Sequence, residues 1–335
     1  MKYIDTHSHI HDKAFDVYRD VLINSLKEKY IYTITIGTDY ETSLAAKRLA
    51  EANENVYYTI GVHPHDNEKA TFDENKFNKL LGDKCVAIGE CGLDYFYLYK
   101  DINKNSNNIN LNVEDNEDIK IIIEKEKSRQ KDLFIKQIIF ARENKLPLML
   151  HGRPSEIDAI NNVDGMDAYH DMIEILSSPT YQPSPLTPSR DSRSGTNTNS
   201  DESLSDSSPK LGALTVPNVL SEREIAKWGN VHFFVGNIDI AKKFIGLGFD
   251  FSLGGVLTIT RDYDEMVKYL PVDRIHAETD SPYVVPRDNE GRRVSKINSP
   301  QNIEIIIERI AELKNITKGN LNSQLLINSK RLYRF

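Results

Sequence analysis

Two histidines near the start of the sequence stand two positions apart, in the motif Asp5-Thr6-His7-Ser8-His9. The apolar run before them is typical of a strand, and alternate residues of a strand point to the same face. Because imidazole is the commonest protein ligand for metal ions, His7 and His9 can hold one ion together. Such a pair also occurs at solvent-facing strand ends, so a metal site needs further ligands.

Further residues of metal-ligand type follow other short apolar runs. Glu90 follows VAIG, His151 follows PLML, His232 lies in NVHFFVG, and Asp280 stands in IHAETDSPY. Each has a structural alternative by itself, because carboxylates cap helices and histidines occur in cores. Together, four histidines and two carboxylates suit Zn, Mn or Mg, and a bridging carboxylate lets two ions lie about 3.5–4 Å apart. The set therefore predicts a metal site built from distant parts of the sequence.

The elements that must position these residues alternate between strands and helices. Eight short apolar runs predict strands at residues 3–5, 33–37, 56–61, 86–89, 147–150, 231–235, 249–253 and 274–277. Amphipathic spacing predicts helices over 43–53 and 132–144. This alternation favours an α/β fold closed into a (β/α)8 TIM barrel, in which all strands end at one rim. An open doubly wound sheet is the alternative, but no Gly-rich phosphate loop follows the first strand.

Insertions interrupt this alternation within one barrel domain that we expect to span residues 1–335. Residues 97–127 begin with an asparagine-rich segment and run into IIIEKEK, which can start a helix. Residues 177–211 are rich in serine and proline and predict a disordered surface insertion. A third, shorter insertion covers 154–165. These loops follow the fourth and fifth strands, so we expect them on the active-site rim.

Composition limits the classes of function. The net charge of −8 provides no overall cationic field for coating nucleic acid. Two cysteines, Cys85 and Cys91, cannot form a disulfide framework and fit a reducing compartment. No signal peptide or membrane-spanning run is present in the sequence, so we expect a soluble, cytoplasmic monomer without a membrane partner. Alternation along the strand places the Cys91 side chain away from Glu90.

Five motifs in order, DTHSHI, IGVHPHD, IGECGLDY, HGR and AETDSPYVVP, give the sequence a specific resemblance. It resembles the TatD family of metal-dependent deoxyribonucleases, a branch of the amidohydrolase-like barrels, over nearly the whole chain apart from the insertions. The resemblance implies that His7, His9, Glu90 and Asp280 hold one ion. It also implies that Glu90, His151 and His232 hold a second, with Glu90 as the bridge.

The same resemblance implies a metal-dependent DNase, acting as a 3′-5′ exonuclease on single-stranded or frayed DNA ends with two divalent ions. In that mechanism Asp280 accepts a proton from an activated water. His63 contacts the scissile phosphate or the leaving group, and His65 orients it. Arg153 binds phosphate or holds a ligand carboxylate, although pairing with a structural acid is an equal alternative.

Other functions remain open on the sequence alone. The same metal pair can hydrolyse another ester or amide bond, as in a D-aminoacyl-tRNA deacylase, and a barrel can also serve as a non-catalytic scaffold. An open groove with stacking aromatics such as Tyr95, Phe96 or Tyr283 would favour nucleic acid. The sequence departs from the family after His232, where Phe233-Phe234-Val235-Gly236 replaces Cys-Phe-Ser/Thr-Gly. A small polar side chain near the second ion is therefore absent.

Overall fold

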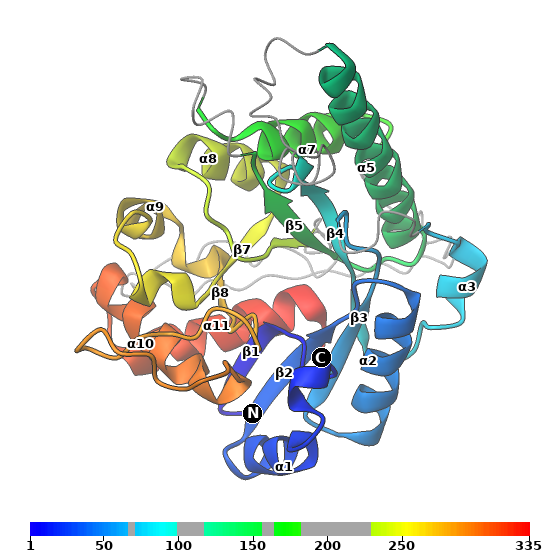
Figure 1. Cartoon of the computed structure of the whole chain (residues 1–335). Helices are drawn as coiled ribbons and strands as arrows, with labels where there is room; N and C mark the ends of the chain where they lie inside the picture. Colours follow the sequence, from blue (N-terminus) through cyan, green and yellow to red (C-terminus); the bar gives the residue numbers. More distant parts are fainter. Residues whose placement is uncertain (66–70, 99–116, 156–163, 182–228) are drawn as a thin grey trace, which may run out of the picture.

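Eight parallel strands form one sheet in the order β1 to β8 in the computed structural model (Figure 1). The structure describes residues 1–65, 71–98, 117–155, 164–181 and 229–335. The strands are β1 (Tyr3–Ser8), β2 (Ile31–Ile36), β3 (Val56–Ile60), β4 (Cys85–Asp94), β5 (Leu148–Arg153), β6 (Gly229–Val231), β7 (Asp250–Leu253) and β8 (Ile275–Ala277). Each pairs with the next in parallel, which confirms the expected (β/α)8 barrel.

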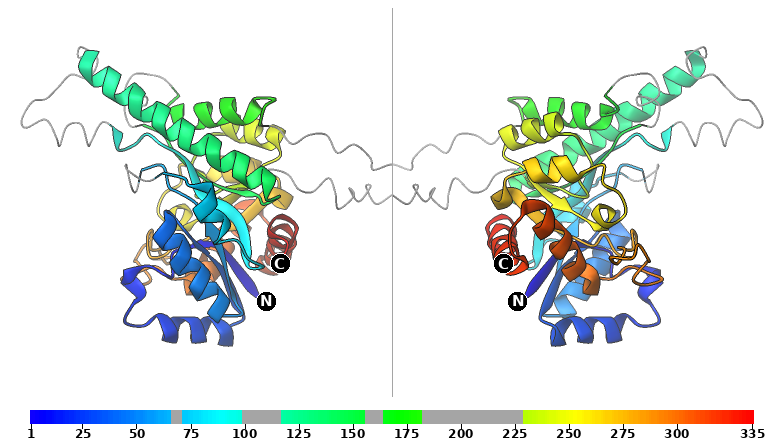
Figure 2. Two further views of the ribbon diagram at one scale, coloured as in Figure 1. Left: turned by 90° about the vertical axis from the view of Figure 1, so that its right-hand side faces the viewer. Right: turned by 90° about the vertical axis from the view of Figure 1, so that its left-hand side faces the viewer.

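Helices surround the strands on the outside of the barrel (Figures 1 and 2). The described helices are α1 (Arg19–Glu28), α2 (Tyr40–Ala52), α3 (Glu74–Asn78), α5 (Glu117–Glu143), α7 (Asp167–Ser177), α8 (Ile238–Leu247), α9 (Asp264–Tyr269), α10 (Ile303–Lys314) and α11 (Lys318–Tyr333). Short 3₁₀ turns lie at η1 (Lys13–Phe15), η3 (Gly255–Thr258), η4 (Val272–Arg274) and η5 (Pro300–Asn302). Local signals set the bounds: Asp39 and Thr42 form a capping box on α2, and Asn237 caps α8.

Contacts between β1 and the segment after β8 close the barrel. The backbone N–H of Asp280 donates to the carbonyl of His7 at 2.9 Å, and that of His9 donates to the carbonyl of Ser281 at 2.7 Å. Beside them the buried Asp5 carboxylate accepts from the backbone N–H and the hydroxyl of Thr279, at 2.8 and 2.6 Å. This seam therefore joins residues about 270 positions apart and fixes Asp280 against β1.

Two separate cores stabilise the barrel. The larger one fills the layer between the helices and the outer faces of the strands. The smaller one lies inside the barrel, where Ile34, Val86 and Met149 pack against Leu332 and Tyr333 at the end of α11. In Figure 1, α11 lies behind the strands. The interior is thus packed with side chains at that end, and polar groups gather at the opposite end, where the strands finish.

The predicted strands are all present, but the first, fourth and fifth run further than expected and contain His7, Glu90 and His151, and the sixth is misplaced. The sixth strand was expected over 231–235, but β6 is Gly229–Val231, so the apolar Phe233 and Phe234 belong to the loop after it. Phe233 leaves the strand because its φ is 46° and its N–H donates to Glu278 at 2.5 Å. Helix α5 is longer than the predicted 132–144 and begins at Glu117, within the region expected to be an insertion.

Most of the predicted insertions lie outside the described residues. Residues 99–116, 156–163 and 182–211 fall in the expected insertions, so their nature stays a prediction; residues 66–70 and 212–228 also lie outside the described ranges. No helix in the described part of the chain is long and apolar enough to cross a membrane.

Candidate active site

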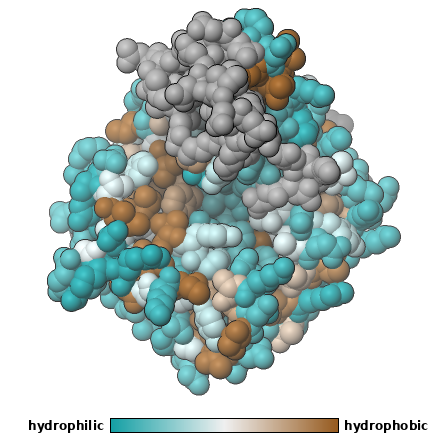
Figure 3. Space-filling model, in the orientation of Figure 1, coloured by the Kyte–Doolittle hydropathy of each residue, from teal (hydrophilic) through white to brown (hydrophobic). Residues whose placement is uncertain are grey.

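Residues from five strands meet at the end of the barrel where the strands finish. His7 lies in β1 and His9 directly after it, Glu90 lies in β4, His151 in β5, His232 directly after β6, and Asp280 three residues after β8. All six predicted ligands therefore converge as the barrel geometry requires. Seen from this end, a hollow with hydrophilic residues lies near the centre of the molecule (Figure 3).

Glu90 stands between two groups of ligand atoms and points one oxygen at each. Its Oε1 lies 2.8 Å from His151 Nδ1 and 2.8 Å from His232 Nε2. Its Oε2 lies 3.4 Å from His7 Nε2 and 3.8 Å from His9 Nε2. The side chain is only 5% exposed, so the carboxylate faces these nitrogens in place of water.

The first group consists of His7, His9 and Asp280. The Nε2 atoms of the two histidines lie 3.2 Å apart, and Asp280 Oδ1 lies 3.7 Å from His7 Nε2 and 3.6 Å from His9 Nε2. Two ring nitrogens and a carboxylate oxygen thus converge on one point. Such a donor set suits a divalent transition metal, and the residues present fit such an ion.

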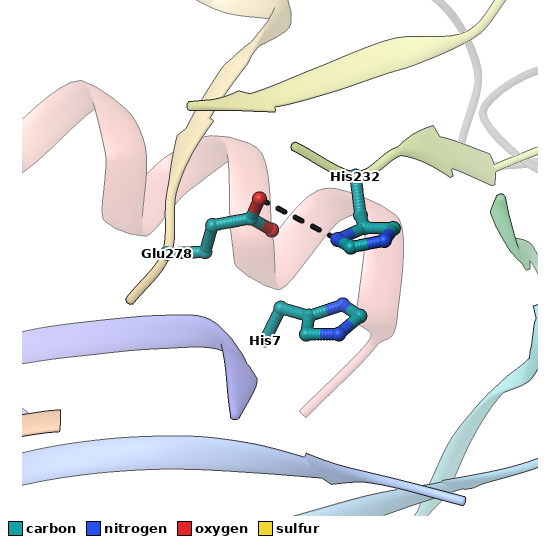
Figure 4. A group of neighbouring side chains, drawn as sticks. All are labelled: His7, His232 and Glu278. Atoms are coloured by element: carbon teal, nitrogen blue, oxygen red, sulfur yellow. Dashed lines mark ion pairs between the residues drawn. The ribbon is translucent and has the colours of Figure 1, made fainter. Parts of the chain in front are cut away.

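The second group consists of Glu90, His151 and His232. His151 Nδ1 and His232 Nε2 lie 3.3 Å apart on either side of Glu90 Oε1. The His232 ring stacks on the ring of His7, with centroids 3.8 Å apart and an interplanar angle of 12° (Figure 4). Ring-nitrogen lone pairs lie in the ring planes, so two stacked imidazoles cannot share one ion. His7 and His232 therefore serve different groups.

Neighbouring charges and hydrogen bonds shift the pKa values of Glu90 and His151 in opposite directions. Burial raises the pKa of Glu90, but the charges of His232 and His7 and hydrogen bonds from His151 and His232 hold it well below its usual range. Burial lowers the pKa of His151, yet hydrogen bonds to Asp94 and Glu90 raise it to about 9. A divalent cation can replace the proton of such a histidine, because metal binding requires deprotonated ligands.

His63 lies next to the second group. Its Nε2 is 3.8 Å from Glu90 Oε1, and its ring packs edge-on against His151 with centroids 4.3 Å apart. The backbone N–H of His65 donates to His63 Nδ1 at 3.2 Å, so Nδ1 accepts and the proton of a neutral His63 ring sits on Nε2. His63 therefore presents a donor toward the centre of the site.

Arg153 and His65 lie in an aromatic cluster beside His63. The Arg153 guanidinium carbon is 3.6 Å from the Phe96 ring centroid and 4.9 Å from that of Tyr97, whose hydroxyl accepts from Arg153 at 3.2 Å. His65 stacks on Tyr97 with centroids 4.5 Å apart. The charge of Arg153 also helps to lower the pKa of the buried Asp94 carboxyl, so interaction with an acid stays open beside phosphate binding.

Comparison with known proteins places this site in a family. A family model described as TatD related DNase matches residues 4–334. The chain belongs to this family. The family assignment makes it a metal-dependent hydrolase acting on ester bonds. The convergence of carboxylates and histidines at the strand ends is the part of the fold that such an activity needs.

Relatives of this TatD-related chain cover its whole length. The uncharacterised metal-dependent hydrolase YabD of Bacillus subtilis is 27% identical over 98% of both chains. The 3′-5′ ssDNA/RNA exonuclease TatD of Yersinia pseudotuberculosis is 26% identical over 93% of this chain and 92% of its own. The solved structure of YJJV, a TatD homologue of Escherichia coli, covers 100% of this chain and 98% of its own with a TM-score of 0.67 at 20% identity, which shows the shared fold.

Two buried carboxylates that hold the ligand histidines were missed by the sequence reasoning. Asp94, the last residue of β4, lies with Oδ2 at 3.0 Å from His151 Nε2. Glu278, after β8, lies with Oε1 at 3.6 Å from His232 Nδ1, an ion-pair distance without a hydrogen bond (Figure 4), and accepts from Ser252. Carboxylates in this position fix the orientation of a ligand imidazole. Both stand inside motifs of this TatD-related sequence, GECGLDY and AETDSPY, which was the available signal.

The structure also shows where Tyr95, Cys91 and the remaining histidines lie relative to their expected positions. Tyr95 was expected as a stacking aromatic, but it is fully buried because its hydroxyl donates to Asp171 in α7 at 2.8 Å. Cys91 is buried in the core and away from the ligands, as predicted. The three histidines without a predicted role, His11, His170 and His276, belong to neither ligand group.

Proposed function

We propose that this chain is a metal-dependent DNase that hydrolyses phosphodiester bonds at the 3′ end of single-stranded or frayed DNA. The observation that carries the proposal is the placement of Glu90, whose two oxygens face two separate groups of ligand nitrogens. A carboxylate so placed is suited to bridging two cations. Two cations can stabilise both the attacking and the leaving oxygen of a phosphoryl displacement.

The ligand arrangement favours two ions over one. His7 and His232 stack with centroids 3.8 Å apart, and both direct Nε2 toward Glu90. Since the two rings lie in separate, nearly parallel planes, their nitrogens would serve two different ions. In the proposed site His7, His9, Glu90 and Asp280 hold one divalent ion, and Glu90, His151 and His232 hold the other, each being Mg, Mn or Zn. When bound, the ions supply an activated water and Lewis acidity.

The protein's own groups accept the proton of the attacking water and contact the leaving oxygen. Asp280 is placed to accept the proton of the attacking water, because its side chain is 15% exposed beside His7 and His9 while its backbone is fixed by the seam with β1. Hydrolysis breaks the bond between phosphorus and the 3′ oxygen of the preceding nucleotide, and that oxygen needs a proton. His63 is placed to donate a hydrogen bond from Nε2 to that oxygen, which takes its proton from solvent water, and Arg153 is placed to bind a phosphate oxygen.

The substrate assignment rests on similarity and on one exposed aromatic residue at the rim. A relative that is 26% identical carries the name 3′-5′ ssDNA/RNA exonuclease. Tyr283, one of the aromatics expected to favour nucleic acid, is 55% exposed beside His9. The negative net charge of the chain is compatible with this role, since an end-processing enzyme needs cationic contacts only around the scissile phosphate.

The test is release of nucleotides from 3′- and 5′-labelled single-stranded DNA. Metal-stripped protein is compared with protein given Mg, Mn or Zn, with Asp280→Asn as the inactive variant and Asp239→Asn, whose side chain is 80% exposed, as its matched control. Loss of label first from the 3′ end, only with metal and not in Asp280→Asn, is the expected result. Metal binding without DNA or RNA cleavage would remove the nuclease assignment. Aminoacyl-tRNA esters would then be the next substrates to assay. If no substrate is hydrolysed, the remaining hypothesis is a non-catalytic scaffold.

A further inference from the structure

The rim of the site has two sides with different chemistry. On one side, at the ends of β3, β4 and β5, lie His65, Tyr97 and Arg153, which we call the cationic side. On the other, after β6, β7 and β8, lie Phe233, Gly254 and Tyr283, which we call the apolar side. Sheet order places these sets on different arcs of the barrel, with the ligand groups between them.

Contacts make the apolar side continuous from β6 to β8. A Cβ atom on Gly254 would lie 3.1 Å from two ring atoms of Phe233, so the missing side chain lets the Phe233 ring lie over the end of β7. A Cβ on Gly255 would lie 2.6 Å from the carbonyl oxygen of Val284, so η3 packs directly against the loop that carries Tyr283. Figure 3 shows hydrophobic residues gathered on this side of the hollow, over the region of α9 and β7 in Figure 1.

Tyr283, on the apolar side, lies three residues after Asp280, the proposed proton acceptor. Its backbone N–H donates to the carbonyl of Asp280 at 2.9 Å, which fixes the turn between them. Its ring packs edge-on against His9 with centroids 5.9 Å apart, while 55% of the residue is exposed. An aromatic ring is thus held at the border of the first ligand group with much of its surface in water.

The cationic side is built to receive phosphate. The Arg153 guanidinium lies over Phe96 and donates to the Tyr97 hydroxyl, which restricts the side chain to one direction. An arginine fixed by stacking recognises phosphate oxygens well, because its planar fork loses little freedom on binding. A single DNA strand likewise has a charged backbone along one edge and stacking bases along the other.

We propose that Tyr283 is the stacking platform for the base of the 3′-terminal nucleotide, with the backbone phosphates turned toward Arg153. The inference rests on the proposed nuclease function and deepens it by fixing the direction in which the strand crosses the site. Stacking on a tyrosine face reads no base edge, so it accepts all four bases. The residue binds substrate and takes no part in proton transfer.

A double-mutant cycle between the tyrosine and the base tests this contact. The substrates are a single-stranded oligonucleotide with an ordinary 3′-terminal base and the same oligonucleotide ending in a tetrahydrofuran residue, which has no base. The enzymes, all with metal, are wild type, Tyr283→Ala, Tyr283→Phe, and Tyr269→Ala, an exposed tyrosine on α9 outside the rim. The measured quantity is kcat/KM for removal of the terminal residue.

We expect Tyr283→Ala to lower kcat/KM for the ordinary end on the order of tenfold, with Tyr283→Phe and Tyr269→Ala near wild type. Removing the base should cost wild type a similar factor and cost Tyr283→Ala almost nothing. If the two penalties multiply instead, Tyr283 does not stack on that base and the inference is wrong while the nuclease function stands. If wild type cleaves neither oligonucleotide, the proposed function itself fails and the inference falls with it.

Discussion

Replacement of Asp94 by asparagine tests whether the buried carboxylates behind the histidines tune metal binding. Asp94 Oδ2 lies 3.0 Å from His151 Nε2, and Oδ1 accepts from the N–H of Phe96 at 3.1 Å. Burial raises the pKa of Asp94, but the hydrogen bond and the charge of His151 hold it below its usual range, so the group is an anion at neutral pH. Asparagine keeps the shape but has one acceptor oxygen for two donors.

The expected loss follows from the role of this contact. Partners that orient a metal-bound histidine are worth about 10–100-fold in metal affinity, which corresponds to about 1.4–2.7 kcal/mol. Because Asp94 touches His151 and not His7 or His9, the loss should fall on one of the two ligand groups. Metal content by plasma mass spectrometry and titration against a chelator would then show one weakened site and one unchanged site.

A matched control separates this effect from a general change in charge. Asp239→Asn removes a carboxylate from the exposed first turn of α8, far from the ligands, and should leave both affinities unchanged. Equal weakening of both sites in Asp94→Asn, with an unchanged unfolding transition, would refute the assignment of Asp94 to His151 alone. Unchanged affinity at both sites would refute any role in metal binding.

Three further changes give independent predictions. Glu90→Gln should lose most bound metal and lower DNase activity at least about a hundredfold, because the Glu90 carboxylate serves both ligand groups. Full metal content in this variant would contradict the bridging role of Glu90. Asp250→Asn should lower the free energy of unfolding in urea at pH 7 by about 2–3 kcal/mol. This loss is smaller than that for breaking a fully buried ion pair, because the partners Arg331 and Arg274 are part-exposed. Burial raises the pKa of Asp250, but His276 and the two arginines hold it below its usual range. The stabilisation by Asp250 is therefore complete above about pH 4 and is lost as the pH falls through the pKa of the folded state. An Asp250→Asn variant whose stability falls with acid as steeply as that of wild type would argue against this contribution. Gly92→Ala places Cβ 2.0 Å from the His151 carbonyl oxygen at a φ of 140°, so we expect more than about 3 kcal/mol of destabilisation, and a wild-type melting temperature would disprove it.

The ligand set could be predicted from sequence because a barrel makes strand ends equivalent. His7, Glu90, His151 and Asp280 each follow or end an apolar run, and closure of eight parallel strands brings such positions together whatever their separation along the chain. His232 was predicted for the same reason, although its strand was placed too late by the apolar residues that follow it. Predicting the strand order and the ligands thus requires only local sequence patterns and the rule that parallel barrel strands all end at one rim.

Contacts between elements were beyond the reach of the sequence. The end of β6 depends on Glu278, which follows β8, two strands away, and accepts from the N–H of Phe233. The sequence suggests that Tyr95 is a surface aromatic residue. In the structure its ring lies in the core, where its hydroxyl donates a hydrogen bond to Asp171, 76 positions away. The roles of Asp94 and Glu278 likewise depend on which histidine each one faces. Spacing along the chain contains no information on such pairs.

The seam between β1 and the segment after β8 has a consequence for how the protein is made. The proposed first ligand group joins His7 and His9, which leave the ribosome early, to Asp280, which leaves it about 270 residues later. At about 5–20 residues per second, the chain spends many seconds with its first histidines and without the aspartate. Contacts this distant in sequence also form slowly, because loop closure precedes any gain from pairing. The active site is therefore among the last features to be assembled, and an incomplete chain carries histidines without a finished catalytic centre.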